Sequence, residues 1–252
     1  MPFDFHPVIA VVQVRMTSSR LPGKVLKPLA GAPLIRRMIE RVLRLDGIDG
    51  VAVALAEGTA NDPVIDALWG MNVTIVRGSE SDVLARSAAA ARAARAQTVM
   101  RITSDCPLLD PAVSAAILAA YKAGHSAGLR YARTSAESGF PHGFDTEVFD
   151  AAALYEAEAK ATDPYEREHA TPYIWRRPDS FPAIIVDAKP DRRHWRITVD
   201  TEDDYRLVSA IYEALYPNDP AFGYVDLCSL FEAQPELLAI NAPLPLADVT
   251  AR

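Results

Sequence analysis

The sequence predicts an α/β fold with one mostly parallel sheet covered by helices on both faces. In the first half of the 252 residues, apolar strand-like runs alternate with helix-like runs, which is the pattern of βαβ units. Half of the residues are hydrophobic, enough for a sizeable core, and no repeat or Pro-rich or Gly/Ser-rich linker interrupts the pattern. We therefore expect a single domain over residues 1–252.

Four strands and four helices are expected in the first half. The expected strands cover residues 8–14, 51–55, 73–76 and 98–102. The expected helices cover residues 33–45, a segment after 62, 82–95 and 111–123. Pro33, Pro63 and Pro111 suit first-turn positions, because proline lacks the N–H group that would be unpaired there. Asp110 is the expected N-cap of the fourth helix.

The second half is less regular, and there the α/β pattern becomes α+β. A turn-rich loop over 139–149 leads into a strand, and Asp163 with Pro164 opens a helix. Further strands are expected near 181–186 and 195–199, and further helices over 205–216 and 225–233. The Pro-rich tail after Asn241 is expected to be loose.

A basic segment follows the first expected strand of this acidic chain. Between Asp4 and Glu40 there is no Asp or Glu, although the segment contains six cations: Arg15, Arg20, Lys24, Lys27, Arg36 and Arg37. Small hydroxyl residues and a Pro-Gly turn lie among the first of them, so that backbone N–H groups can point inward around an anion. The pattern predicts a loop that wraps a triphosphate, although a solvated basic surface loop has the same composition.

Two common phosphate loops are excluded by spacing. A Walker A loop ending at Gly23-Lys24 needs glycine at 18 and Ser or Thr at 25, where this chain has Ser18 and Val25. A G-x-G-x-x-G fingerprint is absent after the first strand, which disfavours NAD and FAD. The net charge of −7 disfavours general nucleic-acid binding.

The cysteines and the N-terminus point to a cytoplasmic location without membrane association. Cys106 and Cys228 lie far apart, without zinc spacing, and are interpreted as buried thiols in a reducing compartment. The residues before the first strand contain Asp4 and His6, and the apolar run that follows is too short for a signal segment or a membrane span.

Two carboxylates follow expected core strands. Asp105 comes after strand 98–102, and Asp200 comes after strand 195–199. Because ligands of open α/β sheets bind at the carboxyl ends of the strands, these two side chains are candidate Mg²⁺ ligands. The alternative is structural: Asp200 as a helix N-cap and Asp105 as a turn residue.

Five ordered motifs resemble the cytidylyltransferase family, in the branch named for spore coat polysaccharide biosynthesis protein F. This branch is related to the enzymes that load 3-deoxy-manno-octulosonate and sialic acid onto CMP. The motifs read Q-V-R-M-T-S-S-R-L-P-G-K-V-L from Gln13, and then cover residues 101–111, 139–149, 167–174 and 196–205. Together they span most of the chain.

The resemblance implies a Rossmann-like nucleotidyltransferase fold with three α/β/α layers, CTP as donor, Mg²⁺ as cofactor and pyrophosphate as leaving group. It implies catalytic roles for Arg15, Lys24 and Asp105, and metal binding by Asp105 and Asp200. The expected nucleotide-binding residues are Gln13, Arg15, Ser18, Ser19, Arg20, Lys24 and Arg101. The chain departs from the family pattern at Thr17 and Ser104, where the family commonly has glycine.

The acceptor is expected to be an acidic sugar for surface polysaccharide or glycoconjugate synthesis. An acid needs a cation for its carboxylate and polar groups for its hydroxyls. The candidate residues are His142, Asp145, Arg167, Glu168 and His169, although the last three also suit a network on a helix surface. Residues 7–125 would form the nucleotide half, and residues 126–240 the acceptor and dimerisation half of a homodimer.

Two other functions compete with this prediction. A glycosyltransferase that uses a preformed nucleotide sugar would hold a metal-bound diphosphate, usually with a D-x-D motif, but none follows the fourth strand. A non-catalytic nucleotide-binding homologue is kept open by Thr17 and Ser104. It would bind CTP without releasing pyrophosphate.

Overall fold

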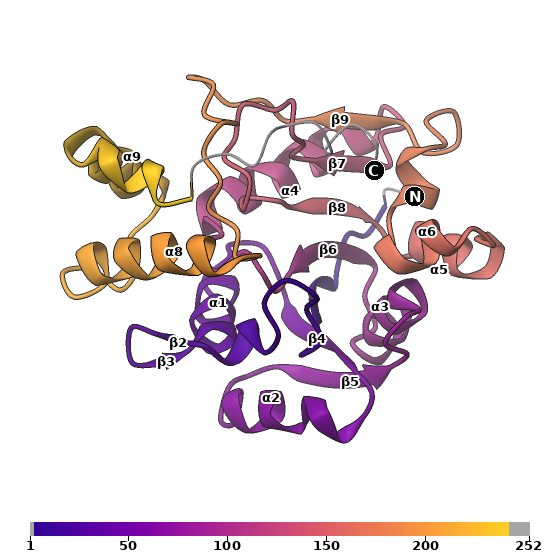
Figure 1. Cartoon of the computed structure of the whole chain (residues 1–252). Helices are drawn as coiled ribbons and strands as arrows, with labels where there is room; N and C mark the ends of the chain where they lie inside the picture. The colour runs from indigo at the N-terminus through magenta and orange to yellow at the C-terminus, as the bar shows by residue number, and fades with distance from the viewer. Residues whose placement is uncertain (1–2, 242–252) are drawn as a thin grey trace.

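A seven-stranded sheet in the order β5-β4-β1-β6-β8-β7-β9 forms the centre of the protein (Figure 1). The structure is a computed structural model that describes residues 3–241. The strands of this sheet are β1 (Val8–Val14), β4 (Gly50–Ala56), β5 (Thr74–Gly78), β6 (Thr98–Thr103), β7 (Tyr131–Arg133), β8 (Glu147–Asp150) and β9 (Ala183–Ile185). A separate short hairpin pairs β2 (Pro28–Leu29) with β3 (Ala32–Pro33).

The sheet is mostly parallel, as predicted, with β8 running against its neighbours. β1 pairs in parallel with β4 and β6, β4 pairs in parallel with β5, and β7 pairs in parallel with β9. β8 lies antiparallel between β6 and β7. Consequently the first residue of β8, Glu147, lies at the same edge of the sheet as the last residues of β6 and β7.

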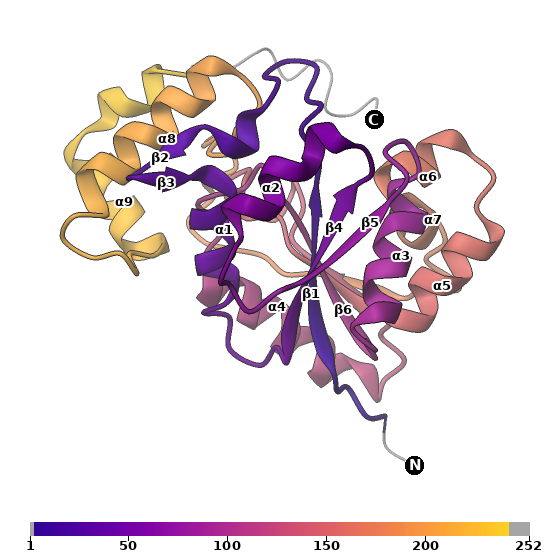
Figure 2. The ribbon, with the colours of Figure 1, turned by 90° about the horizontal axis from the view of Figure 1, so that it is seen from below.

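Helices cover both faces of the sheet (Figure 2). The α-helices are α1 (Leu34–Val42), α2 (Asp62–Ala67), α3 (Val83–Ala93), α4 (Pro111–His125), α5 (Ala151–Lys160), α6 (Pro164–His169), α7 (Pro172–Trp175), α8 (Glu202–Leu215) and α9 (Tyr224–Ala233). Short 3₁₀ turns are η1 (Lys24–Leu26), η2 (Thr59–Asn61) and η3 (Pro235–Ala239). No helix within residues 3–241 is long and apolar enough to cross a membrane.

The alternation of side chains along β1 divides the core into two layers. Val8 and Val12 pack with α1 and α4 on one face, whereas Ile9 and Val11 pack with α3 and α5 on the other. Every residue of β1 is buried because both faces are covered. A third cluster joins α8 and α9 to Leu21 and Leu34, so the helical C-terminal part packs beside the segment that follows β1.

The expected helices and strands of the first half are present with shifts of a few residues at their ends. Asp110 caps α4 as predicted, with its side chain accepting from Val113 N at 2.8 Å. In the second half, α5 and β7 were not predicted. The strand expected over 195–199 is wrong: this segment is irregular and makes one isolated bridge, from Arg196 to His142. The expected loose tail lies outside the described residues.

Asp204 organises the chain where this irregular segment enters α8. Its Oδ2 accepts from the backbone N–H groups of Asp200 at 3.0 Å and Thr201 at 2.9 Å, and from Arg196 Nη2 at 2.7 Å. Its Oδ1 accepts from the Asn241 side chain at 2.8 Å. Thr201 Oγ1 in turn accepts from Asp204 N, which completes a capping box. The backbone of Asp200 is therefore fixed by a buried carboxylate.

We expect Asp204→Asn to lower the free energy of unfolding by about 1 to 3 kcal/mol near neutral pH, because one buried acceptor becomes a donor that faces N–H groups. Burial acts to raise the pKa of Asp204, but bonds from Asn241 and Arg196 outweigh it, and the pKa lies below its usual value. A carboxylate whose pKa is lower in the folded state stabilises the folded protein at pH values above its unfolded-state pKa. This stabilisation is lost as the pH falls through the folded-state pKa.

The difference between the two proteins should therefore shrink below about pH 4, the usual range of an unfolded Asp. Urea unfolding at several pH values measures it. Asp203→Asn is the matched control, because Asp203 is exposed and pairs with Arg206 on the surface of the same helical turn. A deficit that is equal at all pH values would contradict the assigned role of the Asp204 charge.

Candidate active site

The loop between β1 and η1 is closed by backbone hydrogen bonds. The carbonyl oxygen of Met16 accepts from Ser18 N at 3.1 Å and from Gly23 N at 2.9 Å, and Met16 N donates to Asn61 Oδ1 at 2.9 Å. Gly23 has a φ of 70°, a left-handed conformation that glycine adopts without steric cost. The loop therefore has a defined shape and is anchored to η2.

The loop presents cations and hydroxyl groups to solvent. Arg15, Ser19 and Arg20 are exposed and Ser18 is half-buried, with its Oγ accepting from Leu21 N at 3.4 Å. Thr17 donates a hydrogen bond to Glu80, so its extra side chain is turned toward the loop before α3. These groups lie where the sequence placed a triphosphate loop, at the carboxyl end of β1.

The ammonium group of Lys24 joins the three segments of the site. Lys24 Nζ lies 3.3 Å from Asp105 Oδ2, 3.0 Å from Asp200 Oδ1 and 2.7 Å from the carbonyl oxygen of Val199. Its side chain is only 10 % exposed. The two carboxylates that the sequence singled out therefore meet, although Asp200 follows an irregular segment and not the expected strand, and a cation from the end of the loop after β1 lies between them.

The charges of this cluster stabilise one another. Burial acts to lower the pKa of Lys24, but Asp105 and Asp200 outweigh it and raise that pKa above its usual value. Burial likewise acts to raise the pKa of Asp105, and the Lys24 ammonium outweighs it, so this pKa lies below its ordinary range. Both groups are therefore charged near neutral pH.

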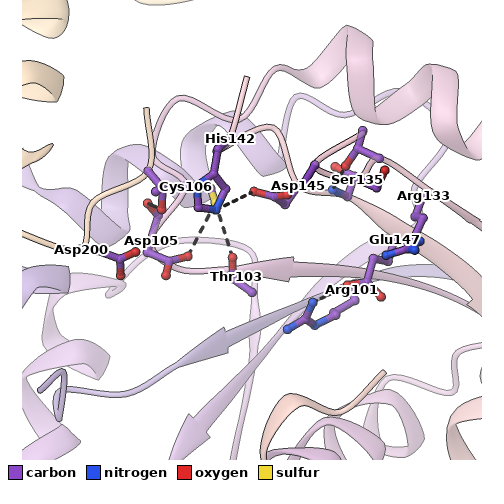
Figure 3. Close-up of a pocket in the computed structure, with 14 residues that line it drawn as sticks. Arg101, Thr103, Asp105, Cys106, Arg133, Ser135, His142, Asp145, Glu147 and Asp200 are labelled. Carbon is purple, nitrogen blue, oxygen red and sulfur yellow. Dashed lines mark hydrogen bonds and ion pairs between the residues drawn. The ribbon is translucent and has the colours of Figure 1, made fainter. Parts of the chain in front are cut away.

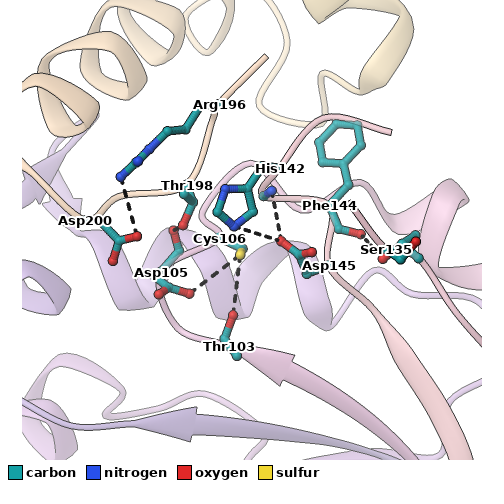
Figure 4. A network of polar contacts seen from close by, with 12 residues as sticks. Thr103, Asp105, Cys106, Ser135, His142, Phe144, Asp145, Arg196, Thr198 and Asp200 are labelled. Atoms are coloured by element: carbon teal, nitrogen blue, oxygen red, sulfur yellow. Dashed lines mark hydrogen bonds and ion pairs between the residues drawn. The ribbon is translucent and has the colours of Figure 1, made fainter. Parts of the chain in front are cut away.

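Asp200 is surrounded by cations, whereas Asp105 is supported mainly through its backbone. Asp200 Oδ2 lies 3.0 Å from Arg20 Nη2 and 3.5 Å from Arg196 Nη2. The carbonyl oxygen of Asp105 accepts from Val199 N at 2.7 Å and from Thr198 Oγ1 at 3.0 Å (Figure 4). These bonds tie the turn after β6 to the irregular segment before α8.

A cavity of about 280 Å³ opens beside Asp105 and Asp200 (Figure 3). The other residues that line it come from β6 and the turn after it, from β7, from the loop between β7 and β8, from the start of β8 and from the segment before α8: Arg101, Thr103, Cys106, Arg133, Thr134, Ser135, Ala136, His142, Asp145, Thr146, Glu147 and Thr198. The cavity thus contains five of the residues that the sequence singled out: Arg101, Asp105, His142, Asp145 and Asp200.

Arg101 and Gln13 are engaged with protein partners. Gln13 Oε1 accepts from Arg101 Nη2 at 3.1 Å, and Gln13 Nε2 donates to Ser87 Oγ at 3.0 Å. Arg101 also forms an ion pair with Glu147, across the β6–β8 register. Gln13 is buried, so these bonds position Arg101 in the cavity wall and leave Gln13 behind it.

His142 and Asp145 form the side of the cavity that faces solvent. His142 Nε2 lies 3.8 Å from Asp145 Oδ2, which also accepts from Gly143 N at 3.0 Å. The loop packs closely here: a Cβ atom on Gly143 would lie 2.9 Å from the backbone of Ile197 and of Thr198. Gly143 also has a φ of 122°, so the close approach of the two segments requires glycine.

Cys106 packs in the wall of the cavity and does not act as a nucleophile. Its Sγ lies 3.4 Å from Thr103 Oγ1 and 3.6 Å from Asp105 Oδ1. Burial, together with the charge of Asp105, raises the pKa of the Cys106 thiol well above its usual range, so the thiol stays protonated. Cys228, which we expected to be buried, is half-buried beside Arg192.

Arg167, Glu168 and His169 lie outside the residues that line the cavity. Arg167 Nε and Nη2 donate to Asp82 Oδ2 at 2.8 and 2.5 Å, and Nη1 donates to the carbonyl oxygen of Glu158 at 2.8 Å. Glu168 and His169 are exposed on α6, and the His169 ring lies 4.3 Å from that of Tyr165. These positions are the ones expected if the three residues form a network on the surface of a helix.

Sequence reasoning missed the residues that β7 and its following loop contribute, above all Arg133, Thr134 and Ser135. β7 is only three residues long, and its apolar-polar alternation, Tyr-Ala-Arg, is too short to indicate a strand. The available signal was the spacing of Tyr131 and Arg133, which puts both side chains on one face of an extended segment.

Comparison with known proteins identifies the family of the chain. A family model described as cytidylyltransferase matches residues 9–220. The chain is 28 % identical to spore coat polysaccharide biosynthesis protein SpsF of Bacillus subtilis, over 82 % of this chain and 87 % of that protein. It is 36 % identical to a 3-deoxy-manno-octulosonate cytidylyltransferase of Anaeromyxobacter, over 46 % of this chain and 48 % of that enzyme.

A solved structure described as a cytidylyltransferase from Leptospira borgpetersenii superposes with a TM-score of 0.85 at 27 % identity. The match covers 92 % of this chain and 96 % of that one. The family match over residues 9–220 includes both the loop after β1 and the segments that surround the cavity.

We expect Arg167→Met to lower the free energy of unfolding by about 1 to 3 kcal/mol, because it leaves Asp82 and the end of α5 without their shared partner. Urea denaturation measures the change. Arg193→Met is the control, since Arg193 pairs with Asp191 on an exposed loop. Equal stability of the two variants would show that Arg167 does not tie α6 to α3.

Proposed function

The chain belongs to the cytidylyltransferase family, and we propose that it transfers CMP from CTP to an acidic sugar for a surface polysaccharide or glycoconjugate. The observation that carries this proposal is the contact of Lys24 with Asp105 and Asp200 at one end of a substrate-sized cavity. Two relatives support the acceptor class by their names, one in spore coat polysaccharide biosynthesis and one acting on 3-deoxy-manno-octulosonate.

The donor triphosphate would bind along the loop after β1. Arg15 and Arg20 are exposed there, and Lys24 lies at the end of the loop. These cations are spaced along one loop, so each can neutralise a different part of a triphosphate chain. Ser18 and Ser19 would add hydroxyl donors.

Asp105 and Asp200 would hold Mg²⁺. Their carboxylate oxygens and the carbonyl oxygen of Val199 converge on one ammonium group, so the site already suits a cation and offers only hard oxygen ligands. Within residues 3–241 no group of three or more His, Cys, Asp and Glu side chains is placed to hold a metal, so this pair of aspartates is the candidate. When bound, the metal would neutralise phosphate charge and orient the phosphate.

The reaction is an in-line substitution at phosphorus. An acceptor hydroxyl oxygen bonds to the α-phosphorus of CTP, the bond from that phosphorus to the β-phosphate oxygen breaks, and pyrophosphate leaves. The hydroxyl proton ends on pyrophosphate or in solvent water. Arg15, Arg20 and Lys24 would stabilise the charge that builds on the leaving group, while His142 and Asp145 bind acceptor hydroxyls.

The direct test combines CTP, Mg²⁺ and either 3-deoxy-manno-octulosonate or N-acetylneuraminate, with pyrophosphate release as the readout. UTP, ATP and GTP are the donor controls. Release that requires both CTP and an acidic sugar supports the proposal, whereas CTP binding without release with any acid would contradict it. Assembly into a homodimer and a cytoplasmic location stay predictions.

We expect Asp105→Asn and Lys24→Met each to lower pyrophosphate release on the order of a hundredfold, as loss of one preorganised charged group does at other sites. Asp203→Asn, on the exposed first turn of α8, is the control. Near-normal turnover by both folded variants would remove the cluster around Lys24 from catalysis.

A second prediction concerns the metal alone. Because Lys24 Nζ stands among the oxygens that would hold the metal, the two cations compete for one place. We expect Lys24→Met to bind Mn²⁺ more tightly than the unaltered protein when no nucleotide is present, on the order of tenfold.

Calorimetric titration with Mn²⁺ measures this affinity without any turnover. Lys27→Met is the matched control, because Lys27 pairs with Glu202 outside the cluster. Weaker Mn²⁺ binding by Lys24→Met would show that the ammonium does not occupy the metal position.

A further inference from the structure

Arg133 stands at the end of the cavity away from the metal candidates. It is the last residue of β7 and lines the cavity wall, half-buried. Arg133 pairs in register with Glu147 of β8, which pairs in register with Arg101 of β6. Figure 3 shows these three side chains grouped together, with Asp105 and Asp200 at the other end of the view. A row of alternating charges therefore crosses three strands.

Glu147 does not neutralise Arg133, because both of its oxygens have other partners. Oε1 accepts from Arg101 Nη1, and Oε2 accepts from the hydroxyl of Tyr131. Within residues 3–241, no acid lies inside the 4.0 Å ion-pair distance of the Arg133 guanidinium. The guanidinium carbon lies 5.9 Å from the centre of the Tyr131 ring and 5.8 Å from the centre of the Trp175 ring.

Three of the four carboxylates of the cavity have a lysine or arginine partner within the protein. Asp105 and Asp200 share Lys24, and Glu147 binds Arg101. The fourth, Asp145, has no lysine or arginine within ion-pair distance among the described residues and lies 3.8 Å from His142. Arg133 is therefore the arginine lining the cavity whose charge no described side chain matches.

Because the cavity wall contains four carboxylates, only a cation that none of them already binds is available to attract an acidic substrate. A guanidinium group also fits a carboxylate better than an ammonium does, since its planar fork donates two parallel hydrogen bonds. The rings of Tyr131 and Trp175 attract the positive charge of the Arg133 guanidinium and restrict where this side chain can point.

We propose that Arg133 binds the acid group of the acceptor and makes the enzyme select an anionic acceptor over a neutral one. This inference rests on the proposed function and adds a residue for acceptor choice. It moves the cation for the acceptor acid from Arg167, which is committed to Asp82, to a side chain in the cavity wall.

The experiment compares 3-deoxy-manno-octulosonate with its methyl ester, which keeps the sugar but lacks the charge of the acid. For the unaltered enzyme, kcat/KM should be higher for the acid. In Arg133→Met, kcat/KM for the acid should fall by about tenfold to a hundredfold, the range for a charge-assisted pair of bonds. The kcat/KM of Arg133→Met for the ester should change little, so this variant should no longer prefer the acid.

Three controls isolate the charge of Arg133. CTP affinity, measured by calorimetry, should stay within about twofold in Arg133→Met, because a loss that lies in the acceptor step alone leaves the donor site intact. Arg133→Lys should restore only part of the preference. Arg176→Met is the matched variant, since Arg176 lies 5.3 Å from the same Trp175 ring but outside the cavity lining, and it should behave like the unaltered enzyme.

The outcomes separate this inference from the proposed function. If the enzyme releases pyrophosphate and Arg133→Met keeps the full preference for the acid, the inference is wrong and the proposed function stands. If no acceptor gives pyrophosphate, calorimetric binding of the acid decides: binding that depends on Arg133 supports the inference while the proposed function fails. Absence of such binding overturns both.

Discussion

The contact of one lysine with two aspartates is the interaction on which the site depends. Lys24 belongs to the loop after β1, Asp105 to the turn after β6, and Asp200 to the segment before α8. Without a cation between them, the two carboxylates would repel each other in a place with little solvent to screen them. The contact thus brings together three segments. Behind it, the side chains of Asp204 and Thr198 bond to the backbone of these segments and hold them in place.

Residues at the ends of long parallel strands were the most predictable part of the site. The sequence placed Asp105 and Lys24 at one sheet edge because both follow recognisable strands: β1 has seven residues, six of them apolar, and β6 has six, with Val99, Met100 and Ile102 apolar. The insertion of Lys24 between the carboxylates could not be predicted, since flexible side chains choose partners only after the backbone has closed. Arg133 was missed because strand pairing, and not local pattern, puts it opposite Glu147.

Sequence reasoning left two roles open for Arg167, one in the acceptor pocket and one in a network on a helix surface. It lies in a motif that resembles the family, and the chemistry of an acidic acceptor calls for an arginine, so both arguments pointed to it. The structure gives its guanidinium to Asp82 and to backbone carbonyl groups of α5 and the residue after it. A motif records which residues occur together, but only the packing of α6 on α3 decides whether a side chain faces a cavity or a neighbouring helix.

The reversed direction of β8 has a consequence for how such proteins diversify. Because β8 enters the sheet at the site edge, the loop from β7 to β8 also lies at that edge. Several of its residues line the cavity, and Gly143 packs against Ile197. Changes of length or sequence in that loop reshape one end of the cavity without disturbing the bonds around Lys24. Selection can therefore change which molecules fit that end of the cavity in small steps, while the contacts among Lys24, Asp105 and Asp200 are inherited unchanged.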